Sequence, residues 1–130
     1  MKKKLIKSTV LLLSLLVGVA SVAVAVTEVD MDLMQRIEES TKNVDSNISL
    51  KDGKAALADA REIEEMFSKV ELYYKHKGDA ADAIEYARKS KNFATELIRQ
   101  VSEKDFDSAS ATVSSLAKSC KTCHQVYKKS

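Results

Sequence analysis

Residues 55–74 read AALADAREIEEMFSKVELYY, and apolar side chains recur in this stretch every three or four positions. That spacing matches the period of about 3.6 residues of an α-helix, so the stretch predicts an amphipathic helix with one buried face. The charged run from Arg61 to Glu65 then forms its solvated outer face. The expected buried face consists of Leu57, Ala60, Ile63, Met66, Phe67, Val70, Tyr73 and Tyr74.

The same period recurs in three other segments. The first opens with the capping-box-like Thr27-Glu-Val-Asp30, and its expected stripe is Met34, Ile37, Thr41 and Val44, with Met31 one turn earlier. The third is expected to bury Ala80, Ala83, Ile84, Ala87, Ala94, Leu97, Ile98 and Val101. The fourth runs from about Phe106 to Lys128 and is expected to bury Phe106, Ala109, Val113, Leu116, Ala117, Cys120, Cys123, His124 and Tyr127.

Polar residues and one glycine mark the expected helix boundaries. Ser49 is expected to cap the second helix and Asp79 the third, while Gly78 should end the second helix in the left-handed conformation. Short connections make neighbouring helices antiparallel, so residues 26–130 predict an all-α, up-down-up-down four-helix bundle. The chain has no proline and only three glycines, which disfavours a β-sheet fold, and we expect no internal repeat.

The N-terminal residues 1–25 have the three-part pattern of a secretory signal peptide. A lysine-rich start precedes the apolar run Val10–Val17, and Ala23-Val-Ala25 supplies small residues at a cleavage site. We expect cleavage near Ala25 and export to the periplasm; the alternative is an uncleaved membrane anchor. Without this segment the charge is nearly balanced, which excludes a strongly basic nucleic-acid-binding protein.

The one motif with distinctive chemistry is Cys120-Lys-Thr-Cys-His124. C-x-x-C-H is typical of covalent haem c attachment: the two thiols lie on one helical face at the spacing of the haem vinyl groups, and the histidine is the proximal iron ligand. Three other interpretations are a thioredoxin-like redox pair, a zinc site and a structural disulfide. No strand precedes the motif, the only other histidine is His76, and a disulfide within a helical C-x-x-C has poor geometry.

With its C-terminal C-x-x-C-H and the ending Tyr127-Lys128, the chain resembles the cytochrome c-prime superfamily of periplasmic four-helix cytochromes over residues 28–130. Met34, followed by Ile37 and Thr41, and the stretch 103–111 are similar to soluble cytochrome b(562). The chain departs from cytochrome b(562) in having the two cysteines and in its short connection at 76–79.

The resemblance implies an electron-transfer protein, not an enzyme, with one haem c attached to Cys120 and Cys123. His124 and Met34 would be the axial iron ligands, with Met31 as second choice. Both Met34 and His124 are expected about 9–11 Å from the same end of the bundle. The implied partners are redox proteins, with no nucleic acid and no small-molecule substrate, and the protein would be a monomer or homodimer.

Two other functions stay open at this stage. One is a cytochrome c-prime-like protein with a five-coordinate iron that binds nitric oxide or carbon monoxide. The other is a helical bundle whose two thiols form a redox-sensing disulfide. Met66 is expected beside the haem or in the core, Phe67, Phe93 and Phe106 in the core, and Tyr127 either beside the haem or in ordinary packing.

Overall fold

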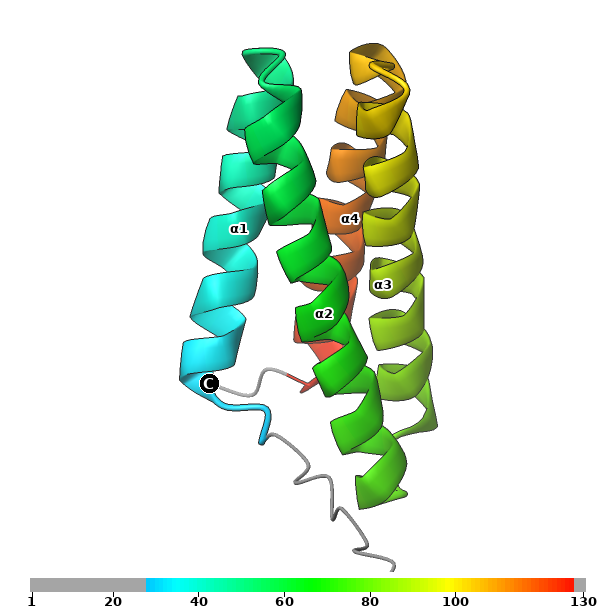
Figure 1. Ribbon diagram of the computed structural model, residues 1–130. Coiled ribbons are helices and arrows are strands. Elements are labelled where there is room, and N and C mark those ends of the chain that lie inside the picture. Colours follow the sequence, from blue (N-terminus) through cyan, green and yellow to red (C-terminus); the bar gives the residue numbers. More distant parts are fainter. Residues whose placement is uncertain (1–27, 128–130) are drawn as a thin grey trace, which may run out of the picture.

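The computed structural model describes residues 28–127, which form four α-helices and no strand within that range. They are α1 (Met31–Ser49), α2 (Gly53–Lys77), α3 (Ala81–Ser102) and α4 (Phe106–Tyr127). Consecutive helices run antiparallel, and contacts close a ring because α4 packs back against α1 (Figure 1). The predicted all-α four-helix bundle is confirmed.

The expected signal peptide lies outside the described residues. Among residues 28–127, no helix combines the length and apolarity needed to cross a membrane.

The core runs along the bundle axis and is built from one stripe of each helix. Its fully buried members include Val44, Ile63, Leu97 and Leu116, one from each helix. The stripe of α1 is shifted from the predicted one and consists of Leu33, Ile37, Ser40, Val44 and Ile48. Met34 is only partly buried and Met31 is 65% exposed, so the expected extension of the stripe to Met31 is wrong.

Aspartates start two of the helices at positions that differ from the prediction. The Asp30 carboxylate accepts a hydrogen bond from the Leu33 amide at 2.9 Å, and the Asp52 carboxylate accepts one from the Ala55 amide at 3.0 Å. The predicted cap at Ser49 is wrong, because Ser49 is the last residue of α1 and a turn separates it from α2. Thr27, the start of the expected capping box, lies outside the described residues.

The α2–α3 connection confirms one predicted boundary and corrects another. Gly78 ends α2 with φ 79°, the left-handed conformation that glycine adopts without steric cost. The predicted cap at Asp79 is wrong: Ala80 occupies the N-cap position of α3, and no side chain accepts a hydrogen bond there.

The α1–α2 and α3–α4 turns share the sequence Ser-x-Lys-Asp, at 49–52 and 102–105. Lys51 (φ 56°) and Lys104 (φ 61°) both adopt the left-handed conformation. Their amides donate to Ile48 and Val101 carbonyls at the same distance of 3.0 Å. The two helical hairpins thus have equivalent turns. We expected no internal repeat, and this correspondence escapes a search for repeats because it involves only four residues in each turn.

Replacing either left-handed lysine with glycine should stabilise the protein. Lys51→Gly and Lys104→Gly remove the contact between Cβ and backbone that makes positive φ unfavourable, and each should raise the free energy of unfolding by about 0.5–1 kcal/mol in urea titrations. Lys54→Gly, within α2, is the control and should lower it by about 1 kcal/mol. Destabilisation by both turn variants would contradict this account of the turns.

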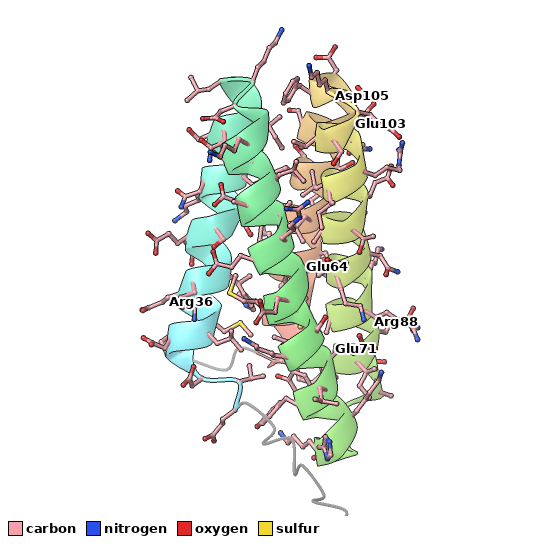
Figure 2. The ribbon with its side chains drawn as sticks, viewed as in Figure 1. Arg36, Glu64, Glu71, Arg88, Glu103 and Asp105 are labelled. Atoms are coloured by element: carbon pink, nitrogen blue, oxygen red, sulfur yellow. The ribbon has the colours of Figure 1, made fainter. Side chains whose placement is uncertain are left out.

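A buried carboxylate joins α2 to α3. Glu71 is 5% exposed, and its two oxygens accept from Lys75 Nζ of α2 and Lys91 Nζ of α3, each at 2.6 Å (Figure 2). Burial alone would raise the pKa of Glu71, but the hydrogen bonds and charges of the two lysines outweigh burial and hold the pKa below its ordinary value. Ionised Glu71 therefore stabilises the folded state.

The stability contributed by Glu71 should depend on pH with a defined sign. Because its folded pKa is lowered, that stability is present above the unfolded pKa of about 4.5 and is lost as the pH falls through the folded pKa. Glu71→Gln should lower the free energy of unfolding by about 1–3 kcal/mol at pH 7. Below pH 4.5, the free energy of unfolding should decrease less steeply with falling pH in the variant than in the native protein. Glu65→Gln, at an exposed ion pair on the same helix, is the control and should change stability little at pH 7. If Glu71→Gln and Glu65→Gln changed the free energy of unfolding equally, burial would not be the reason that the Glu71 ion pairs stabilise the protein.

Candidate functional site

A cavity of about 570 Å³ lies between α1 and α4, with contributions from α2 and α3 at its inner wall. This volume falls in the range of about 300–1,000 Å³ that is typical of small-molecule and cofactor sites. The lining residues of α1 lie at positions 34–42 and those of α4 at positions 117–125. Figure 1 shows the start of α1 and the end of α4 at the same end of the bundle. Its lining residues are Met34, Ile37, Glu38, Thr41, Lys42, Phe67, Tyr86, Ser90, Ala117, Cys120, Lys121, Cys123, His124 and Gln125.

Helix α4 brings the whole C-x-x-C-H motif to this cavity. Cys120, Cys123 and His124 are spaced i, i+3 and i+4, which places them on one face of the last turns of the helix. Both cysteines are free thiols and are partly buried, whereas His124 is exposed. The sulfurs therefore lie toward the core and the imidazole toward the mouth of the cavity.

Helix α1 supplies Met34 from the opposite wall. Met34 is three residues from the start of α1 and His124 is three residues from the end of α4, so at 1.5 Å per residue both lie about 4.5 Å from the same end of the bundle. The expected 9–11 Å was too large, because α1 starts at Met31 rather than Thr27 and the described part of α4 ends at Tyr127. Both residues nevertheless line the same cavity. Met31 does not line the cavity.

The aromatic and apolar residues divide between the cavity wall and the core. Phe67 does both, since it is buried in the core and also lines the cavity. Met66 is 1% exposed and belongs to the core alone. Phe93 and Phe106 pack against the core and do not line this cavity. Tyr127 packs against Tyr74 of α2, with ring centroids 5.8 Å apart, and is not a lining residue.

Sequence reasoning missed the part of the wall that comes from α3. Tyr86 and Ser90 are spaced i, i+4 on that helix and both line the cavity. The Ser90 hydroxyl hydrogen-bonds the Ser119 hydroxyl of α4 at 2.9 Å, which satisfies two buried polar groups. A serine on the buried stripe of each of these helices was the only signal in the sequence.

The electrostatic environment keeps both thiols protonated at neutral pH. Burial, followed by the neighbouring Cys123, raises the pKa of Cys120 to about 11, and burial raises the pKa of Cys123. Burial and the nearby Cys123 also raise the pKa of Tyr74. Redox-active cysteines have lowered pKa values because the thiolate is the nucleophile, so this environment disfavours a redox-sensing pair.

The alternative of a zinc site lacks a ligand set in the described part of the chain. Across residues 28–127, no three side chains of the types His, Cys, Asp and Glu come together as a metal-binding group. The groups that line the cavity include two thiols, one imidazole and one thioether, together with the Glu38 carboxylate. The thiols, the imidazole and the thioether fit haem c, in which the thiols bind the porphyrin and the other two groups bind the iron.

Comparisons of the chain with protein-family models, with curated proteins and with solved structures found no match. The resemblance to four-helix cytochromes therefore stays a prediction carried by the residues quoted above. The fold is established by the structure, and the functional interpretation depends on the chemistry of the cavity.

Proposed function

We propose that this protein is a periplasmic c-type cytochrome that carries electrons on a single haem and is not itself an enzyme. The observation that carries the proposal is the shared cavity: Cys120, Cys123 and His124 of α4 and Met34 of α1 all line it. Met34 precedes the three residues of α4 by 86 to 90 positions in the sequence, and the antiparallel packing of α1 and α4 brings them together.

The cysteines hold the cofactor. Each thiol would add its sulfur to one carbon of a haem vinyl group and its hydrogen to the other, a step that needs no external oxidant. Because both thiols come from the rigid helix α4, the two thioethers fix the cofactor to a single element of the bundle. Lys121 also lines the cavity and has no ion-pair partner within residues 28–127, so its ammonium is available to a haem carboxylate.

His124 and Met34 set the type of reaction. His124 of α4 would hold the iron through an imidazole nitrogen, and Met34 of α1 would hold it through its thioether sulfur. Haem with this ligand pair provides a one-electron couple with no free position for an external ligand. An electron carrier of this kind would exchange its electron with other redox proteins, which we therefore propose as partners.

Covalent attachment is tested by denaturing electrophoresis with haem staining. The exported protein should give one stained band, and Cys120→Ala/Cys123→Ala should give none, because the remaining contacts are non-covalent and do not survive denaturation. Ser114→Ala, at an exposed position of the same helix, is the control and should stain like the native protein. Complete extraction of haem from the native protein by acid acetone would refute the proposal.

Axial ligation by Met34 is tested by absorption spectroscopy and carbon monoxide binding. Met34→Ala should convert a low-spin spectrum to a high-spin one, allow rapid carbon monoxide binding and lower the reduction potential, because a methionine ligand favours reduced iron. Met31→Ala should leave all three measurements unchanged, since Met31 is outside the cavity. A native protein that is already high-spin would favour the gas-binding alternative instead.

A further inference from the structure

A second, smaller cavity of about 260 Å³ lies between α3 and α4. Tyr86, Lys89 and Phe93 of α3 line one side, and Ser115, Lys118 and Thr122 of α4 line the other. Tyr86 also lines the larger cavity, so the two spaces share one lining residue. We call this second cavity the α3–α4 cleft.

The cleft has positive charge without a counterion. Lys89 and Lys118 make no ion pair within residues 28–127, and no acidic residue lines the cleft. Their neighbours on α3 differ, because Arg88 pairs with Glu85 and Lys91 pairs with Glu71. Helix α4 carries no aspartate or glutamate from residue 108 to residue 127, so that side of the cleft has no acid at all.

Most hydroxyl groups of the cleft already have hydrogen-bond partners. The Ser115 hydroxyl donates to the Ala111 carbonyl at 3.2 Å, and the Thr122 hydroxyl donates to the Lys118 carbonyl at 2.9 Å. The Tyr86 hydroxyl has no hydrogen-bond partner in the described part of the chain. The donors left for a ligand are thus two ammonium groups and one phenol.

The walls of the cleft restrict the ligand further. The rings of Tyr86 and Phe93 form an apolar part beside the two lysines. The volume lies just below the range of about 300–1,000 Å³ of drug-sized sites, which restricts the ligand to a small molecule. A ligand that matches both parts has an anionic group and a compact apolar body.

We propose that the α3–α4 cleft binds a small organic carboxylate with an apolar or aromatic body. The carboxylate accepts hydrogen bonds from Lys89, Lys118 and the Tyr86 hydroxyl, and the apolar body lies against Phe93. Charge-assisted hydrogen bonds of this type are the strongest available to an anion at a protein surface. The proposal does not depend on haem, because no cleft residue is one of the cofactor-binding residues.

The test is a nuclear magnetic resonance titration of the purified, isotope-labelled protein with sodium benzoate at constant ionic strength. Saturable shifts at Tyr86, Phe93 and Lys118 are expected. Lys89→Gln/Lys118→Gln should weaken binding about tenfold or more, and Tyr86→Phe should weaken it several-fold. Arg61→Gln/Lys69→Gln, which removes two positive charges of α2 that do not line the cleft, is the matched control and should leave binding unchanged.

Three results would overturn the proposal. The first is the absence of saturable shifts at the cleft residues. The second is equal weakening in the two double variants, which would mean non-specific attraction by net charge. The third is equally tight binding of inorganic phosphate, which would show that the apolar wall contributes nothing and that the ligand class is wrong.

Discussion

The structure depends on one constraint: each helix has a single apolar stripe, and a helix is not stable until that stripe is buried against other helices. Four antiparallel helices satisfy the constraint because every stripe faces the same axis, where Val44, Ile63, Leu97 and Leu116 meet with no exposed surface. Once the stripes are paired in this way, the direction and height of every other side chain follow. The candidate site is a consequence of that packing.

The α1–α2 and α3–α4 hairpins pack together through two interfaces, α2–α3 and α1–α4, and these interfaces differ in how tightly side chains fill them. The turns at Lys51 and Lys104 are equivalent after a shift of 53 positions, and under the same shift Glu71 of α2 corresponds to His124 of α4. Between α2 and α3, Glu71 is buried and bonded to Lys91, which holds the two helices together. Between α1 and α4, no ion pair joins the two helices near His124 among the described residues, and the 570 Å³ cavity lies there instead.

For the haem that we propose, this asymmetry would combine a closed side that holds the bundle together with an open side that a redox partner could approach. The closed α2–α3 side supplies rigidity, and the open α1–α4 side leaves His124 exposed at the mouth of the cavity. The raised pKa values of Cys120 and Cys123 have the same origin, because the thiols lie toward the core where burial disfavours a charge.

The sequence by itself determined the four helices and their antiparallel order, because periodicity is a local property. The spacing of Cys120, Cys123 and His124 likewise predicted that they share one helix face, and their role in binding haem stays a prediction. It also indicated that Met34 lies level with His124, since equal distances from two helix ends can be counted along the chain. It placed the caps of α2 and α3 at Ser49 and Asp79 and missed the true helix starts, because several nearby residues can cap and only the turn geometry selects among them.

Tertiary structure decided which residues face the same space. Met31 and Met34 differ by less than one helical turn, yet only the rotation of α1 against its neighbours leaves one exposed and brings the other to the cavity. Tyr86, Lys89 and Lys118 carry no local signal, because their significance lies in the space that they share between α3 and α4. A stripe predicts that a side chain is near the axis, but the packing angle and volume of the facing side chains determine where the interior stays open.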